Sequence, residues 1–359
     1  MLYYLLPDLE STIGFFRVFQ FITVRSGLAM FTAFLVVVIF GNRTIERLRK
    51  LKVDQIIRED GPPTHKTKVG TPTMGGVLIV AAVVVSSLLW TELFNPIIIC
   101  VLMVTAAFGA IGFVDDYLKI KRKDAKGFKG SYKIVLEALI VVAALMLLSW
   151  SGKADSQLWL PFFKELTPDL AGFFVVFALF VVLGSSNAVN ITDGLDGLAI
   201  MPVVMVIATF GVIAYLIGRE DTSQYLYIPF IYGAGELTVF AGAVIGAGLG
   251  FLWYNCHPAQ VFMGDVGSLS LGGAIGMMAV ITKHELVLIL VGGIFVVEVL
   301  SVILQVGYFK LTRGKRILLM APLHHHFEQK GWPEEKVIVR FWIIQVLLVL
   351  SALATLKLR

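Results

Sequence analysis

Long uninterrupted apolar stretches alternate with short polar segments along the chain. A helix that crosses the hydrocarbon core of a bilayer needs about 20 predominantly apolar residues. The stretches are apolar at every position, whereas the strands of a membrane barrel alternate, so the pattern predicts helices. Ten stretches fit this description: 17–40, 74–91, 96–114, 134–150, 170–186, 198–218, 237–253, 268–282, 286–309 and 339–356. We therefore expect an all-α polytopic membrane protein with about ten transmembrane helices, folded as a single domain over residues 1–359.

The composition excludes several other classes of protein. Hydrophobic residues make up 57% of the chain and charged residues 15%, whereas a soluble domain has about 45–50% and about 25%. A soluble enzyme, a disordered protein, a collagen and a coiled coil are therefore excluded. Two cysteines in 359 residues also exclude a disulfide-stabilised scaffold. The first stretch is not a cleavable signal peptide, because no basic segment precedes it.

The distribution of Lys and Arg predicts the orientation in the membrane. With ten spans both termini lie on one side, and the polar segments 42–72, 115–131 and 310–338 lie on the other. These three segments carry 20 Lys and Arg residues, against seven on the side of the termini. Because cytoplasmic loops are enriched in Lys and Arg, we expect the three segments in the cytoplasm and both termini in the periplasm. The net charge of +5 then reflects orientation rather than nucleic-acid binding.

Carboxylates gather in the loops of the expected cytoplasmic face. Asp115 and Asp116 follow the third stretch, Asp193 and Asp196 follow the fifth, and Asp265 precedes the eighth. Solvation alone explains the last three poorly, because their loops contain no Lys or Arg and lie at the mouths of apolar helices. The loops of the opposite face show no comparable cluster.

Aspartates from separate loops on one face are typical of a magnesium site that handles phosphates. Mg²⁺ binds one or two carboxylates and takes its other ligands from water and substrate phosphates. Lys68, Lys119 and Lys133 can balance phosphate charge, and the nearby glycines allow the backbone to approach a ligand closely. The pattern therefore predicts diphosphate chemistry with an active site at the cytoplasmic face.

Each of these motifs also has a purely structural alternative. Asp115 and Asp116 could cap a helix or pair with the lysine one turn later. Asp193 and Asp196 could N-cap the helix that follows them. The run 324–326 of three histidines could bind a transition metal, although three consecutive side chains on a helix cannot all face one ion. We favour phosphate binding by one or two of these histidines.

Five motifs together resemble those of one enzyme family. They are T-P-T-M-G-G at 71–76, D-D at 115–116, N-x-x-D-G-L-D-G at 190–197, F-M-G-D-V-G-S at 262–268 and P-L-H-H-H-F-E at 322–328. Over nearly its whole length the chain resembles the polyprenyl-phosphate N-acetylhexosamine-1-phosphate transferases. Within them, its histidine motif is most similar to that of the branch acting on UDP-N-acetylmuramoyl-pentapeptide (UDP-MurNAc-pentapeptide).

The resemblance implies an activity, a cofactor and partners. Such an enzyme transfers phospho-MurNAc-pentapeptide to undecaprenyl phosphate in the lipid bilayer, giving lipid I and UMP for peptidoglycan synthesis. It implies Mg²⁺, a homodimer and a multi-pass position in the bacterial inner membrane. The closest alternative is a sister enzyme that transfers GlcNAc-1-phosphate to the same lipid. A transporter is disfavoured, because transporters carry polar sites near the membrane midplane.

The resemblance also implies roles for individual residues. We expect Asp265 to bind Mg²⁺, Asp115 and Asp116 to lie at the lipid phosphate, and His324 to contact the diphosphate or the surroundings of the metal. Phe262 is expected to stack on uracil, with anchoring at the membrane interface as the alternative. Asp193, Asp196 and Asn255 would help to bind the nucleotide. The full set of further substrate-binding candidates is Lys68, Thr73, Lys119, Lys133, Asn190, Asp193, Gly194, Leu195, Asp196, Asn255, His325 and His326.

Two pairs of residues inside the stretches complete the sequence-based expectations. Glu137 and Glu298 are carboxylates well inside spans, which we interpret as interhelical hydrogen-bond partners or groove linings. Gly292 and Gly293 interrupt the ninth stretch, and glycine pairs are common at helix kinks. We expect a bend there that opens a groove for the polyprenyl chain.

Overall fold

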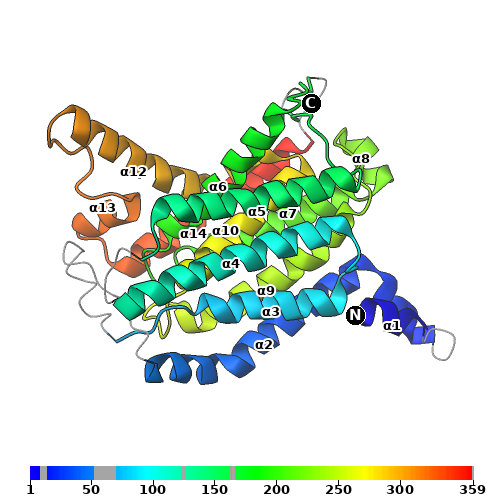
Figure 1. The fold of residues 1–359 in the computed structure, drawn as a ribbon, viewed down its shortest axis with the longest axis horizontal. Coiled ribbons are helices and arrows are strands. Elements are labelled where there is room, and N and C mark those ends of the chain that lie inside the picture. Colours follow the sequence, from blue (N-terminus) through cyan, green and yellow to red (C-terminus); the bar gives the residue numbers. More distant parts are fainter. Residues whose placement is uncertain (9–13, 52–69, 123–126, 162, 164–165, 358–359) are drawn as a thin grey trace.

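The structure, a computed structural model, describes residues 1–8, 14–51, 70–122, 127–161, 163 and 166–357. Within these residues the architecture is helical, with an isolated bridge between Gln157 and Asp169. Most helices run side by side along the long axis of the molecule (Figure 1). In chain order they are α1 (Leu2–Asp8), η1 (Gly14–Gln20), α2 (Ile22–Lys50), α3 (Gly76–Trp90), α4 (Pro96–Arg122), α5 (Gly130–Trp150), α6 (Phe173–Thr192), α7 (Ile200–Ile217), α8 (Glu220–Leu226), η3 (Ala234–Glu236), α9 (Leu237–Asn255), α10 (Gly264–Thr282), α11 (Glu285–Val291), α12 (Gly293–Leu311), α13 (Leu323–Gln329) and α14 (Glu334–Thr355).

The long helices correspond to the predicted spans. In the described part of the chain, nine helices are long and apolar enough to cross a membrane, and α3 is a shorter apolar helix of 15 residues. Each predicted stretch overlaps one of these ten helices, with α11 and α12 sharing the ninth. The prediction of an all-α polytopic membrane protein with about ten spans is therefore confirmed.

Helix α10 occupies the centre of the bundle. It packs against α6 and α4, and 89% of its 18-residue apolar segment is buried inside the protein. Gly272 and Gly276 face the backbone of α6 so closely that a side chain at either position would collide with it. Small residues allow helix backbones to approach in this way within a membrane protein.

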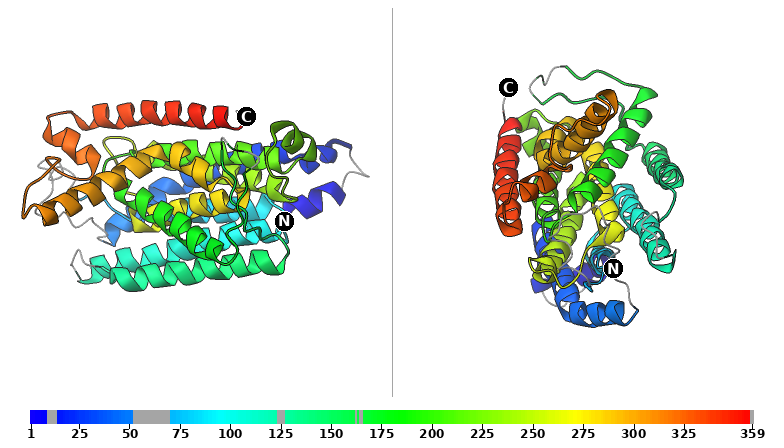
Figure 2. Two further views of the ribbon diagram at one scale, coloured as in Figure 1. Left: turned by 90° about the horizontal axis from the view of Figure 1, so that it is seen from above. Right: turned by 90° about the vertical axis from the view of Figure 1, so that its left-hand side faces the viewer.

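The helices at the periphery expose apolar side chains. Only 22% of the 18-residue apolar segment of α2 is buried, and 28% of the corresponding segments of α5, α12 and α14. Figure 2 shows α14 on one side of the bundle and α4 with α5 on the opposite side. Leu139, Ile303 and Leu350 are each about 60% exposed on these helices. Such surfaces suit contact with lipid rather than water, which agrees with a multi-pass membrane protein.

Several helices extend beyond the apolar stretches that predicted them. α4 continues to Arg122, α6 continues to Thr192, and α10 begins at Gly264. Asp115, Asp116 and Asp265 therefore lie on regular helical turns, and their expected placement in loops was wrong. Backbone hydrogen bonding continues a helix past the end of its apolar sequence when the following residues tolerate it.

The ninth span is divided, as the glycine pair predicted. α11 ends at Val291, Gly292 adopts non-helical backbone angles, and α12 begins at the next residue. α12 leads away from the bundle towards α13 (Figure 1). An apolar groove of 310 Å³ lies between α6 and these two helices, with lining residues that include Phe177, Phe180, Leu288, Phe295 and Ile303.

Candidate active site

Three aspartates from two helices meet at one end of the bundle. Asp115 and Asp116 lie in the last two turns of α4, and Asp265 lies in the first turn of α10. The helices approach closely because Gly112 faces the backbone of Asp265, where a side chain would collide. One carboxylate oxygen from each aspartate lies within 4.8 Å of the others. This all-oxygen set fits a hard divalent cation such as Mg²⁺.

Two lysines neutralise part of the aspartate charge. Nζ of Lys119 lies 2.8 Å from Asp115, 3.4 Å from Asp116 and 3.0 Å from Oδ2 of Asp265. Nζ of Lys133, on α5, lies 3.0 Å from the same Asp265 oxygen and 3.7 Å from Asp115. The expected pairing of Asp115 and Asp116 with Lys119 is therefore present, and Lys119 also pairs with Asp265. Lysine side chains are long, so a cation or a phosphate can replace these contacts by moving them.

Asn190 connects the end of α6 to this cluster. Its Nδ2 donates to Oδ1 of Asp265 at 2.8 Å and to Oγ of Ser268 at 2.8 Å. The Asp265 carboxylate is thus held on one oxygen by an amide and on the other by two ammonium groups. Groups on α4, α5 and α6 fix its orientation, which is the arrangement that a preorganised site requires.

The segment 71–76 is attached to the start of α10. Three backbone hydrogen bonds of 2.8 Å join it to residues 262–263. The pairing brings Thr73 beside Gly264, whose φ of +71° favours glycine. Both motifs therefore form one wall of the aspartate cluster. Lys68 precedes this segment and lies outside the described residues.

The candidates for nucleotide binding lie on the segment after α6 and the loop after α9. Asp193 follows the last residue of α6 and is half-buried, whereas Asp196 is buried. Neither caps α7, because the residue that precedes this helix is Ala199, without a side-chain cap. The capping alternative for the two aspartates is therefore wrong.

Asn255 joins these two segments. Its Oδ1 accepts the N–H of Gly197 at 3.0 Å, and its Nδ2 donates to the carbonyl of Val261 at 2.9 Å. The next residue, Phe262, is half-buried at the junction with segment 71–76. Leu195 instead packs in an apolar cluster with residues of α14. The asparagine thus holds the loop that carries Phe262 against the segment after α6.

The three histidines of α13 point in different directions. His324 is fully buried, with Nδ1 3.2 Å from the Glu298 carboxylate and Nε2 packed against Gly194. His325 pairs with Glu328 at 2.7 Å, and burial lowers the pKa of its imidazole although this carboxylate offsets part of the effect. His326 accepts the backbone N–H of Leu319 at 3.1 Å. The three imidazoles therefore have three different partners.

Sequence reasoning missed the residues around His257. Glu298, expected as an interhelical hydrogen-bond partner or a groove lining, is a hydrogen-bond partner: its oxygens accept the first two N–H groups of α13 at 2.9 and 3.2 Å. His257 and Glu334 attracted no prediction, yet both contact Asp196. A carboxylate in an apolar span was the available signal for Glu298. No comparable signal marked His257 and Glu334, because these residues lie far apart in the chain.

Known proteins resemble this chain along its full length. The Glycosyl transferase family 4 model matches residues 98–283, and signature 1 of phospho-N-acetylmuramoyl-pentapeptide-transferase matches residues 68–80. A protein of Syntrophus aciditrophicus (strain SB) named phospho-N-acetylmuramoyl-pentapeptide-transferase is 52% identical over 359 residues and is covered completely, as is this chain. The chain belongs to the phospho-N-acetylmuramoyl-pentapeptide-transferase family. The resemblance to this enzyme family is thereby confirmed, and the matched signature includes segment 71–76, which docks on the start of α10.

Proposed function

We propose that the protein transfers phospho-MurNAc-pentapeptide from UDP-MurNAc-pentapeptide to undecaprenyl phosphate, forming lipid I and UMP in the bacterial inner membrane. Full-length similarity to a protein of that name is the observation that carries this proposal. The cluster of three aspartates and two lysines at one end of a membrane bundle supports it, because diphosphate transfer depends on charge neutralisation and positioning.

The active site faces the cytoplasm in this proposal. Twenty Lys and Arg residues on the loops of that face, against seven on the other, support the orientation. Both termini lie towards the end of the bundle opposite α13 (Figures 1 and 2), which is compatible with periplasmic termini. The nucleotide sugar then arrives from the cytosol, where such substrates are made.

Asp265 is the residue we assign to Mg²⁺, with Asp115 and Asp116 beside it. When bound, the ion supplies charge neutralisation for the diphosphate. A phosphate oxygen of the lipid attacks the β-phosphorus of the UDP-sugar, and the bond to the UMP oxygen breaks. Little base catalysis is needed, because the second pKa of a phosphate monoester is about 6. Lys119 and Lys133 then turn from the aspartates to the phosphates.

The second group of residues binds the nucleotide side of the donor. We assign Phe262 to stacking on uracil, and Asp193, Asp196 and Asn255, on adjoining segments, to hydrogen bonding with the nucleotide. His324 contacts the diphosphate, since its Nε2 has no hydrogen-bond partner among the described residues although it is buried. Glu298 on α12 accepts the backbone N–H of His324, which restricts the position of the imidazole. Lys68, Thr73, His325 and His326 are assigned to more peripheral contacts with phosphate or peptide.

The lipid substrate reaches the site from the bilayer along the apolar groove between α6 and α11–α12. Ala188 lines this groove near the end of α6, and Asn190, which contacts Asp265, projects from a different face of the same turn. The groove therefore reaches the end of the bundle that carries the aspartate cluster. The bundle exposes apolar surface on α12, so an isoprenoid chain can enter sideways from lipid.

The test is UMP release by the detergent-purified protein. Release from UDP-MurNAc-pentapeptide and undecaprenyl phosphate with Mg²⁺, and its loss with EDTA, are the expected results. Release from UDP-GlcNAc alone would assign the protein to the sister activity, and no release from folded protein would overturn the transferase proposal. We also propose a homodimer, for which light scattering of the detergent-solubilised protein should give twice the mass of one 39.4 kDa chain.

A further inference from the structure

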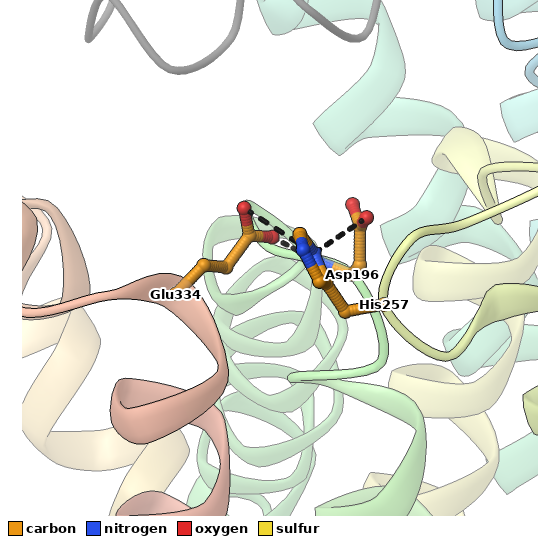
Figure 3. A group of neighbouring side chains, drawn as sticks. All are labelled: Asp196, His257 and Glu334. Atoms are coloured by element: carbon orange, nitrogen blue, oxygen red, sulfur yellow. Dashed lines mark hydrogen bonds and ion pairs between the residues drawn. The ribbon is translucent and has the colours of Figure 1, made fainter.

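A second group of potential metal ligands lies apart from the three aspartates of the proposed active site. Asp196 lies between α6 and α7, His257 lies in the loop after α9, and Glu334 begins α14. Figure 3 shows the aspartate and glutamate side chains converging on the imidazole from opposite sides. One ligand atom of each lies within 4.8 Å of the other two. Three segments that are distant in sequence therefore present three donor atoms to one point.

The spacing of these atoms fits a four-coordinate ion. Nδ1 of His257 lies 3.2 Å from Oδ2 of Asp196 and 3.7 Å from Oε2 of Glu334. Tetrahedral ligands at the usual zinc bond lengths are about 3.3–3.5 Å apart. The imidazole side chain is 29% exposed, so an ion and a water ligand can reach it from solvent. Small side-chain movements suffice to centre a metal among the three atoms.

The opposite edge of the imidazole supplies an independent indication. Nε2 of His257 lies 3.1 Å from Oε1 of Glu335. A histidine that binds a metal through one ring nitrogen usually donates its other N–H to a carboxylate, which fixes the tautomer and orients the ring. The two carboxylates facing Nδ1 are themselves oriented by backbone N–H groups, at 2.9 Å from Ala259 and 3.0 Å from Asp196.

We propose that Asp196, His257 and Glu334 form a binding site for a divalent transition-metal ion, Zn²⁺ being the best match. A nitrogen donor with two carboxylates suits this class of ion better than Mg²⁺, which favours oxygen ligands alone. The ion fastens the first turn of α14 to the segments after α6 and α9. Any influence of the ion on UDP-sugar binding rests on the proposed function, because Asp196 is assigned to the nucleotide there. The binding of the metal ion itself does not depend on that function.

The experiment measures metal rather than turnover. The full-length protein in detergent is stripped with a chelator, loaded with Zn²⁺, washed and analysed by mass spectrometry for zinc per chain. We expect His257→Ala and Glu334→Gln each to lower the zinc content by one ion per chain. Glu335→Gln removes only the outer partner of the imidazole, so it should retain the site with at least about tenfold weaker affinity. Co²⁺ loading should give the intense visible absorption of a four-coordinate ion.

Matched variants at the other candidate sites separate this proposal from alternatives. Asp265→Asn in the aspartate cluster and His325→Gln on α13 should both retain the zinc. Retention by His257→Ala with loss in either of these two variants would overturn the proposal. Absence of zinc and of the Co²⁺ spectrum from the native protein would also overturn it, leaving the contacts of His257 with the carboxylates as purely structural. UMP release by the same native sample tests the transferase proposal separately.

Discussion

The Glu298 carboxylate on α12 lies 3.2 Å from Nδ1 of His324 and also accepts the His324 backbone N–H at 3.2 Å. The same side chain accepts the N–H of Leu323 at 2.9 Å. One buried glutamate therefore satisfies the start of α13 and lies close to Nδ1 of the ring that faces Gly194, without a hydrogen bond to that nitrogen. Glu298 is a positioning residue in the transferase proposal, since it acts on the diphosphate through His324.

Replacing this glutamate should impair turnover more than donor binding. Glu298→Gln retains the shape of the side chain but removes the charge that lies beside the imidazole and accepts the first two N–H groups of α13. We expect kcat for UMP release to fall by up to about a hundredfold, because small displacements of a reacting group have effects of that size. The KM for UDP-MurNAc-pentapeptide should change much less. Steady-state kinetics with purified protein measures both constants.

Gln305→Ala is the matched control for this prediction. Gln305 lies two turns further along α12 and accepts the N–H groups of Ile317 and Leu318, so it also supports the following loop. Its hydrogen bonds within the described residues join that loop and not α13. An equal loss of kcat in this variant would show that any weakening of α12 suffices, and would contradict a specific role for Glu298.

A methyl group at Gly194 should displace His324. The Cβ of Gly194→Ala would overlap Nε2 of the buried imidazole, which has little space to move. We expect a loss of kcat at least as large as that of Glu298→Gln. Gly172→Ala, at the other end of α6, meets no atom within 4 Å and serves as the control. The contact is irrelevant to catalysis if both variants release UMP at the native rate.

Asp265→Asn should abolish most activity without unfolding the protein. The amide cannot replace a charged ligand of Mg²⁺, so we expect a rate about a thousandfold lower and a higher Mg²⁺ requirement. Asp169→Asn, an exposed carboxylate in an outer loop, should stay within about twofold of native. Titration of the rate with Mg²⁺ is the measurement. Near-native turnover with unchanged Mg²⁺ dependence in the Asp265 variant would refute the metal assignment.

Removal of one lysine should have opposite effects on metal and substrate. Lys133→Gln takes a positive charge away from Asp265, so cation binding without substrate should strengthen by about tenfold or more. The same change removes a partner of the diphosphate, so the KM for the donor should rise. Mn²⁺ binding followed by electron paramagnetic resonance measures the first effect. Lys129→Gln, an exposed neighbour beside Tyr132, should change neither quantity.

The sequence predicted the spans well because lipid imposes a simple rule on them. Every residue that faces hydrocarbon must be apolar, so ten stretches were visible without any knowledge of packing. The divided ninth span was visible too, because Gly292 and Gly293 stand in an otherwise continuous run. The ends of the helices were less predictable. Charged residues after position 114 suggested a loop, whereas α4 continues for two more turns with Lys119 paired to Asp115.

The motifs predicted which residues gather, but they did not predict how these residues are held. The contact between Gly194 and His324 joins positions 130 residues apart, and no local pattern encodes it. The three backbone bonds between 71–76 and 262–263 likewise follow from packing of whole helices. Side chains that support others, such as Glu298, carry no motif of their own. Their identification required the fold.

The burial of α10 has a consequence for the protein in membranes of different composition. This helix carries Asp265 and has the lowest mean hydropathy of the nine spans. Neighbouring helices separate almost all of its apolar segment from lipid. Changes in bilayer thickness act on helices through their lipid-facing surfaces. They should therefore tilt the peripheral helices α2, α5, α12 and α14 first. The position of Asp265 on α10 should therefore depend little on the thickness of the membrane in which the protein resides.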